Sequence, residues 1–313
     1  MAQLSGSQAI GVGFRLIGRR PFAVLVWGVL YSVITFAPQV YGYWAIWPEV
    51  TKALRSMGGA TAAGGNGGAL AQAMEQIRLE MLPYQLMQIP LGFVALAVVF
   101  AAIYRAVLEP RDSGFAYLRL GVQELWMLAV SFAGGVIGLI VFVPILIVAA
   151  IAGMGARQLP QPAAGLAIFL IVVGLIALCL WLGARMSLAL PMTFAQRRFR
   201  FFESWGLTRG HGWQIVGVML ALVLIIILIE VVLGIILFAA VLAGVGTHWQ
   251  GMSAAMARSP DTWIAGLAPW IAVGSLAYAA LIGAFHALVV APAADIYRQL
   301  TAEAPSPADF GAP

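Results

Sequence analysis

Six long apolar stretches dominate this sequence. They run over residues of about 22–46, 84–108, 125–152, 163–190, 213–244 and 263–294. The hydrocarbon core of a bilayer is about 30 Å thick, so a helix that spans it needs roughly 20 mostly apolar residues. Each stretch is long enough and continuously apolar, whereas barrel strands alternate over about ten residues. We therefore expect an all-α polytopic membrane protein with six transmembrane helices.

The composition agrees with this fold class. Of the 313 residues, 62% are hydrophobic and 9% are charged, and the mean hydropathy is +0.97. Soluble domains contain about 25% charged residues, so no water-soluble fold could bury this much apolar surface. We expect residues 1–299 to form a single transmembrane domain and residues 300–313 to form a disordered cytoplasmic tail. Residues 70–82 are helical in pattern, and we expect them to lie along the outer surface.

The distribution of basic residues predicts the orientation. Twelve of the 17 lie in the amino-terminal segment, in the connections after the second and fourth spans, and in the tail. The opposite side carries the remaining five, which are Lys52, Arg55, Arg78, Arg157 and Arg258. Since short cytoplasmic loops are enriched in Lys and Arg, both termini are expected in the cytoplasm.

The spans form an internal pattern of three helical hairpins. The second helix of each pair carries a basic residue five or six positions before a proline, in YRAVLEP, ARMSLALP and FHALVVAP. The first helix of each pair follows an aromatic and polar stretch, namely GFRLIGRRPF, AYLRLGVQELW and SWGLTRGHGW. This repeat predicts a short interfacial amphipathic helix before every hairpin. The alternative is that basic residues and prolines simply accumulate at cytoplasmic helix ends.

The three basic residues of this pattern are Arg105, Arg185 and His286. If they converge near the inner leaflet, they could hold an anionic lipid phosphate or another acidic ligand. The competing interpretation is that each side chain reaches towards the interface by itself and pairs with the carboxyl end of its own helix.

Residues 197–213, RRFRFFESWGLTRGHGW, combine arginines with aromatic rings. In a soluble protein this mixture would suggest nucleic-acid binding. Here the segment lies between two spans, so its rings and cations suit lipid headgroups better, and no nucleic-acid partner is expected. The candidate lipid-binding residues in it are Arg197, Arg198, Arg200 and Arg209.

Glu230 is the one carboxylate within the fifth apolar stretch, in VLIIILIEVVLGIILF. An ionisable side chain at this depth costs several kcal/mol unless it is protonated, paired or hydrated. It is therefore a candidate intramembrane functional residue that faces a cavity. The alternative is a protonated glutamate that hydrogen-bonds to a neighbouring helix.

No catalytic motif is present. The sequence has no phosphate-binding Walker motif, no nucleophile elbow and no HExxH. The single Cys179 and three isolated histidines do not form a metal-binding pattern. We expect neither enzymatic activity nor a metal or cofactor.

One segment resembles a known family. Residues 184–217, ARMSLALPMTFAQRRFRFFESWGLTRGHGWQIVG, are similar to a stretch of poorly characterised bacterial inner-membrane proteins. These include the membrane domains attached to some glycerophosphodiester phosphodiesterases and the related YciC-type proteins. The matching residues are Ala184, Arg185, Ser187, Ala189, Pro191, Ser204, Trp205, Leu207, Thr208, Gly210 and Trp213. The resemblance implies six spans and an inner-membrane location but no activity, and the phosphodiesterase activity is not carried over.

Together these features predict a non-enzymatic protein of the bacterial inner membrane that interacts with lipids, anionic ones among them, or with other membrane or envelope proteins. The alternative is a secondary transporter or channel for a small solute or lipid, in which Glu230 is a coupling or gating residue.

Overall fold

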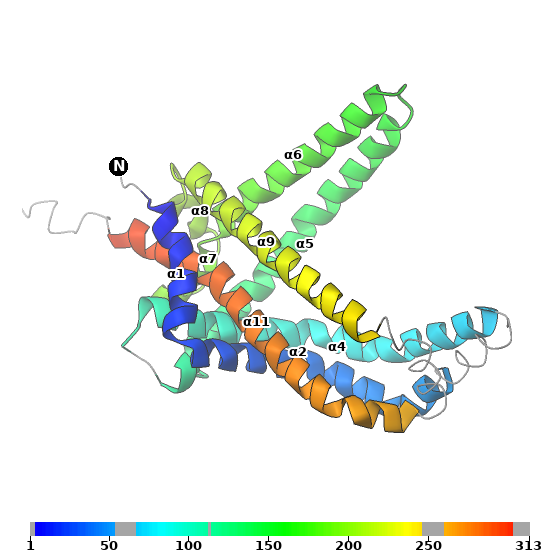
Figure 1. Ribbon diagram of the computed structural model, residues 1–313. Helices are drawn as coiled ribbons and strands as arrows, with labels where there is room; N and C mark the ends of the chain where they lie inside the picture. Colours follow the sequence, from blue (N-terminus) through cyan, green and yellow to red (C-terminus); the bar gives the residue numbers. More distant parts are fainter. Residues whose placement is uncertain (1–3, 54–66, 112–113, 246–259, 303–313) are drawn as a thin grey trace, which may run out of the picture. The chain divides into compact units, whose positions relative to one another are not determined.

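The computed structural model describes residues 4–53, 67–111, 114–245 and 260–302. These residues form helices and connections without any strand (Figure 1). Within these described ranges, six helices are long and apolar enough to cross a membrane, which confirms the predicted fold class. They are α2 (Pro21–Ala45), α4 (Gly67–Leu108), α5 (Val122–Ala156), α6 (Ala163–Met186), α9 (Gly212–Val245) and α11 (Pro260–Ala302).

The segments that precede the first, third and fifth spans differ in length. A 14-residue helix, α1 (Gly6–Arg19), precedes α2. The single 3-10 turn η1 (Phe115–Tyr117) precedes α5, and the five-residue helix α8 (Glu203–Leu207) precedes α9. A further short helix, α7 (Ala189–Gln196), follows α6. Of the three approach segments, only α1 is therefore long enough to present an extended amphipathic face.

The chain divides into two compact units. Unit 1 contains residues 1–24, 96–223 and 286–313, and unit 2 contains residues 25–95 and 224–285. The helices α2, α4, α9 and α11 each contribute residues to both units. That residues 1–299 form a single transmembrane domain remains a prediction.

Within unit 1, α1 packs against α11. The buried residues Ala9, Val12 and Leu16 recur at helical spacing and form one face of α1. Gly13 lies on the same face, where a Cβ atom would lie 2.9 Å from the Cα atom of Leu288. The absence of a side chain at Gly13 thus allows α1 to approach α11 closely.

Within unit 2, α2 contacts both α11 and α4. A Cβ atom at Gly28 would lie 1.7 Å from the carbonyl oxygen of Ala279, so the two backbones meet there. On the α4 side, Gln39 Nε2 donates a hydrogen bond to Gln88 Oε1 at 2.6 Å. A small residue at a helix crossing and a polar pair between helices are the usual contacts of transmembrane helices.

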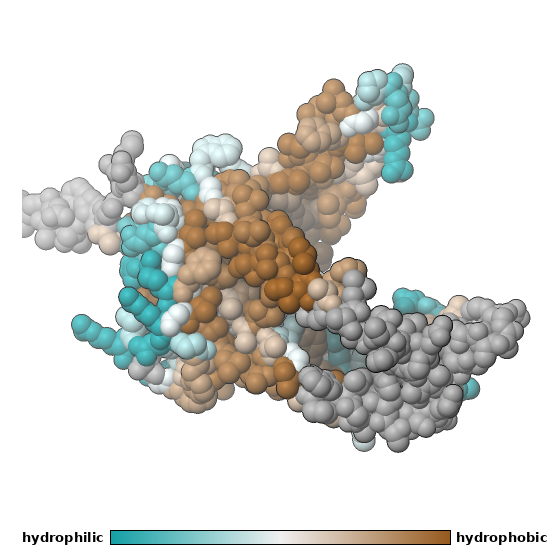
Figure 2. Space-filling view, viewed as in Figure 1, coloured by the Kyte–Doolittle hydropathy of each residue, from teal (hydrophilic) through white to brown (hydrophobic). Residues whose placement is uncertain are grey.

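The helices α5 and α6 form an antiparallel hairpin within unit 1 (Figure 1). In the most apolar part of α5, no residue is buried inside the chain. In the most apolar part of α6, only 6% of the residues are buried. The hairpin is hydrophobic along its length and hydrophilic at its tip (Figure 2), where Arg157, Gln158 and Gln161 are exposed. Such a surface is suited to contact with lipid tails between two polar boundaries.

Several boundaries differ from the prediction for identifiable reasons. Residues 70–82 are helical but continuous with α4. The helix α6 ends at Met186 instead of residue 190, because Pro191 has no N–H group to donate to the carbonyl of Ser187. The helix α11 continues to Ala302, and so includes the first residues of the predicted tail. The rest of that tail, residues 303–313, lies outside the described residues.

Candidate functional site

Arg105 lies near the end of α4 and is neutralised inside the protein. Its Nη2 atom donates to Glu124 Oε1 at 2.5 Å and to Gln123 Oε1 at 3.2 Å, and its Nη1 atom donates to the carbonyl oxygen of Tyr117 at 2.6 Å. The side chains of this ion pair are 1% and 7% exposed. The guanidinium also lies 5.5 Å from the ring centroid of Phe194. Arg105 thus has an internal counter-charge and joins α4 to the start of α5.

Arg185, in the last turn of α6, lies between two tryptophans. Its guanidinium carbon is 5.6 Å from the ring centroid of Trp181 and 5.7 Å from that of Trp205. Its backbone carbonyl accepts a hydrogen bond from Ser204 Oγ at 2.7 Å. The buried Nε and Nη1 atoms have no hydrogen-bond partner among the described residues. Cation–π contact with two indole rings compensates part of the lost hydration of this cation.

His286 lies in α11 and is 6% exposed. Its ring packs against Phe100 of α4, with the two ring centroids 5.9 Å apart. Each of the three basic side chains in the predicted pattern, Arg105, Arg185 and His286, therefore lies against an aromatic ring. Their aromatic neighbours differ, and a shared anion site formed by all three remains a prediction.

The connection between α7 and α9 is held by hydrogen bonds inside unit 1. Ser204 and Thr208 are both fully buried. Thr208 Oγ1 donates to the carbonyl of Ser204 at 3.0 Å, and the backbone N–H of Arg200 donates to Thr193 Oγ1 at 3.1 Å. Gly210, with φ of +82°, makes the left-handed turn that leads into α9. The small polar residues of the segment therefore fix its backbone.

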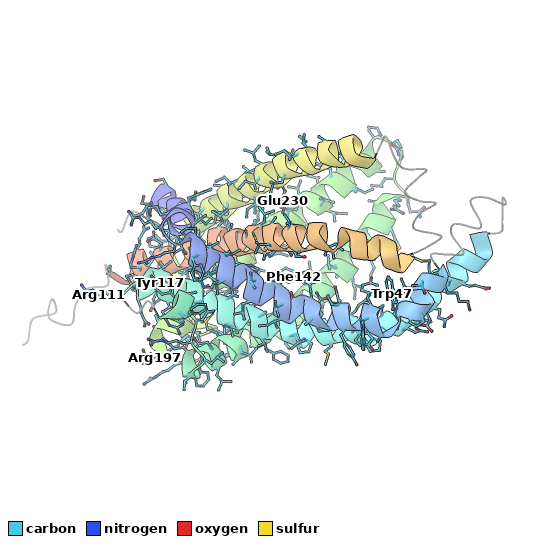
Figure 3. The ribbon with its side chains drawn as sticks, turned by 60° about the horizontal axis from the view of Figure 1, so that its bottom comes forward. Trp47, Arg111, Tyr117, Phe142, Arg197 and Glu230 are labelled. Carbon is cyan, nitrogen blue, oxygen red and sulfur yellow. The ribbon has the colours of Figure 1, made fainter. Side chains whose placement is uncertain are left out.

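The same connection directs cations and rings outward. Arg197, Arg198 and Arg209 are exposed, and Phe202 and Trp213 are 66% and 84% exposed. Figure 3 shows Arg197 at the end of unit 1 that also carries Arg111 and Tyr117, whereas Phe142 of α5 lies away from this end. We call residues 197–213 the interfacial connection. Its exposed side chains combine positive charge with large aromatic surface, which suits the boundary between lipid headgroups and tails.

Arg200 differs from its neighbours because it has a carboxylate partner. Its Nη1 atom donates to Glu203 Oε1 at 2.8 Å. This hydrogen bond, together with one from the backbone N–H of Glu203, lowers the pKa of the Glu203 carboxyl. The Glu203 carboxylate offsets the charge of Arg200, so Arg200 contributes less net positive charge to the interfacial connection than Arg197, Arg198 and Arg209.

Glu230 lies on α9 within unit 2 (Figure 3). Its side chain is exposed, as are those of its neighbours Leu228, Ile229 and Val231. It makes no hydrogen bond or ion pair with any residue that the structure describes. The structure thus places this carboxylate on the outer apolar surface of the helix.

Sequence reasoning did not find the partners of the predicted cations. Glu124 follows the start of α5 by two residues, and its pairing with Arg105 spans 19 positions. The available signal was an acidic residue immediately before the apolar stretch 125–152, at a membrane boundary where a carboxylate is favoured by a basic partner. Among the described residues, no group of three or more His, Cys, Asp or Glu side chains is arranged to hold a metal ion.

Comparisons with known proteins do not narrow the function. No protein-family model matches the chain, and no curated protein and no solved structure matches it. The fold and the arrangement of its charges define the class, which is a multi-pass helical membrane protein.

Proposed function

We propose that this protein is a non-enzymatic component of the bacterial inner membrane that binds anionic lipid headgroups through the interfacial connection. The observation that carries the proposal is the outward orientation of Arg197, Arg198 and Arg209 beside the exposed rings of Phe202 and Trp213. The cations would attract lipid phosphates while the rings insert at the level of the glycerol groups.

The predicted orientation supports this proposal. By the positive-inside rule, the interfacial connection faces the cytoplasmic leaflet, whose anionic lipids attract basic segments. Each arginine near such a surface contributes about 1 kcal/mol, so three unpaired arginines favour an anionic environment by about 3 kcal/mol. Other envelope proteins with acidic surfaces could use the same exposed cations, and the experiment below separates lipid from protein partners.

The transporter alternative has less support. Glu230 would need a hydrated cavity or a counter-charge, yet it is exposed among apolar side chains. It also does not line the large apolar cavity of unit 2, whose volume is ≈ 1020 Å³ and whose lining includes Phe36, Trp44 and Tyr278. A lipid-binding role requires no such path.

The proposal is tested by the lipids that the full chain retains. The protein is reconstituted into bilayers of equal parts phosphatidylglycerol and phosphatidylcholine, excised with a membrane-solubilising polymer, and analysed by lipid mass spectrometry. The test variant is Arg197→Gln/Arg198→Gln/Arg209→Gln. The matched control, Lys52→Gln/Arg78→Gln/Arg157→Gln, removes three exposed cations from the predicted outer side.

We expect the wild type and the control to retain an excess of phosphatidylglycerol that falls at high salt, because exposed charges are screened within about 8 Å at physiological ionic strength. The test variant should lose most of this excess. Equal retention by the test variant and the control would refute the proposal. If purified acidic envelope proteins, but not lipids, distinguished the two variants, the partner would be a protein.

A further inference from the structure

A second group of arginines surrounds a cavity elsewhere in unit 1. The cavity has a volume of ≈ 280 Å³ and is formed by α1, the end of α4, η1 and the end of α11. Four arginines line it, Arg15, Arg19, Arg20 and Arg298, and Tyr117 contributes an aromatic ring. None of the lining residues carries a carboxylate.

The inner wall of this cavity is apolar. Val12, Leu16 and Val107 line it and are each 8–9% exposed, and Ala106 has the same burial. The guanidinium-bearing residues Arg15, Arg19 and Arg20 are exposed, so an incoming ligand can reach them. A charged rim around an apolar wall strengthens electrostatic attraction, because fewer water molecules screen the charges.

A hydrogen-bond network holds Arg298 at the cavity. Arg298 Nη2 donates to a carboxylate oxygen of Asp295, which is fully buried. The other oxygen of Asp295 accepts from Gln299 Nε2 at 2.8 Å, and Gln299 Oε1 accepts from the backbone N–H of Ser5 at 2.9 Å. Since Ser5 caps the amino end of α1, this network fixes α1 to the end of α11.

Two further arginines are oriented by contacts outside the network. Arg15 Nη2 donates to the carbonyl of Gln8 at 3.3 Å, and the guanidinium of Arg20 lies 5.9 Å from the ring centroid of Tyr117. Tyr117 is itself held through its carbonyl oxygen by Arg105. The arginines therefore lie around the cavity on a scaffold of defined contacts.

The charges around the cavity are unbalanced. Asp295 offsets the charge of Arg298, and no lining carboxylate offsets those of Arg15, Arg19 and Arg20. Like charges confined around an apolar wall repel one another, and an anion with several acceptor oxygens removes this repulsion. Guanidinium groups bind phosphate in a bidentate geometry, which makes arginine suited to this role.

We propose that this cavity, which we call the arginine cavity, binds a phosphate group. Its volume corresponds to about nine water molecules at about 30 Å³ each, which is enough for a phosphate with a small substituent. The source is either the headgroup of a lipid or a soluble phosphate ester. The arginine cavity lies beside the start of α2 and the end of α4, and these ends of the two spans are expected in the cytoplasmic headgroup region. The proposal extends beyond the interfacial connection, because the two sites share no residue.

The test uses the full chain in an uncharged detergent and two probes, phosphatidylglycerol and inorganic phosphate. The variant Arg15→Gln/Arg298→Gln removes two of the four cavity cations and keeps Arg19 and Arg20. The control Arg111→Gln/Arg157→Gln removes two exposed cations that lie outside both the cavity lining and the interfacial connection. Lipid retained per chain is measured by mass spectrometry, and binding of phosphate is measured by the rise in Tm of the delipidated protein.

If the site takes a lipid headgroup, the wild type and the control retain equal phosphatidylglycerol, and the test variant loses the share bound at the cavity. Its affinity there falls about 25-fold, at about fivefold for each arginine. If the site takes a soluble phosphate, phosphate raises the Tm of the wild type and of the control only. Equal responses of the test variant and the control to both probes would overturn the proposal. Should the test variant fail to fold, Arg15→Lys/Arg298→Lys replaces it. Lysine keeps the charge but cannot bind phosphate in the bidentate geometry of a guanidinium group. Unchanged binding in that variant would therefore also overturn the proposal.

Discussion

The buried ion pair between Arg105 and Glu124 provides the sharpest test of how unit 1 is held together. Replacing Glu124 with glutamine keeps the shape of the side chain and one acceptor oxygen but removes the negative charge. The guanidinium of Arg105, whose side chain is 1% exposed, would then be buried without a counter-charge.

The cost follows from this burial. Breaking a buried pair by removing one partner typically destabilises a protein by about 3–5 kcal/mol. Glutamine retains a hydrogen-bond acceptor, and the carbonyl of Tyr117 still accepts from Arg105 at 2.6 Å. We therefore expect Glu124→Gln to lower the free energy of unfolding by about 3 kcal/mol, near the lower end of that range.

The double variant Arg105→Met/Glu124→Leu forms a cycle with the single variants Arg105→Met and Glu124→Leu. It removes both charges together, so its cost should be smaller than the sum of the two single changes. In the double variant, the carbonyl of Tyr117 has lost its hydrogen-bond donor, and this loss costs about 1–3 kcal/mol of stability.

Unfolding is followed by tryptophan fluorescence and circular dichroism in mixed micelles with a rising fraction of sodium dodecyl sulfate. The control is Glu203→Gln, which breaks the exposed pair with Arg200 and should leave the unfolding midpoint unchanged. If Glu124→Gln and Glu203→Gln shifted the midpoint equally, or if the costs of the single changes simply added, the proposed role of the Arg105–Glu124 pair would be incorrect.

Three further predictions concern unit 2. Gly28→Ala places a methyl group 1.7 Å from the carbonyl oxygen of Ala279 and should destabilise the protein by about 1–3 kcal/mol. The control Gly92→Ala, which has open space around it, should leave the stability unchanged. Similar unfolding midpoints for the two variants would contradict the α2–α11 contact. Gln39→Leu removes the hydrogen bond between α2 and α4 and should lower the free energy of unfolding by about 0.6 kcal/mol in the same assay. A gain in stability would contradict this prediction. Glu230→Gln should leave proton-linked flux in proteoliposomes at the wild-type level, and loss of an ion-coupled flux would favour the transporter alternative.

The positions of the spans could be predicted because the length and polarity of the bilayer determine them. The first and fifth stretches, predicted at 22–46 and 213–244, are Pro21–Ala45 and Gly212–Val245 in the structure. The end of α11 was missed because hydropathy falls there while packing continues, with Ile296 and Tyr297 buried in the core of unit 1. A hydropathy pattern detects contact with lipid but does not detect packing against protein.

The pairing of side chains could not be predicted, since it depends on contacts between distant parts of the chain. The sequence did not identify Glu124 as the partner of Arg105; the turn at η1, with Ala116 and Tyr117 at positive φ, brings the two side chains together. The arginine cavity combines Arg15 with Arg298, which are almost the full chain apart. In contrast, the exposed cations of the interfacial connection are local in sequence, and the amino-acid pattern alone identified them.

The central claim, that anionic phosphate groups bind at the arginine-rich end of this protein, is tested most directly by photo-crosslinking. A phospholipid with a photoactivatable headgroup is incorporated with the full chain into bilayers, and the cross-linked peptides are mapped by mass spectrometry. We predict that cross-links concentrate on residues 197–213 and on the segments around Arg15 and Arg298, and that excess phosphatidylglycerol suppresses them. Cross-links concentrated instead near Lys52 and Arg157, which are predicted to lie on the outer side, would contradict the account.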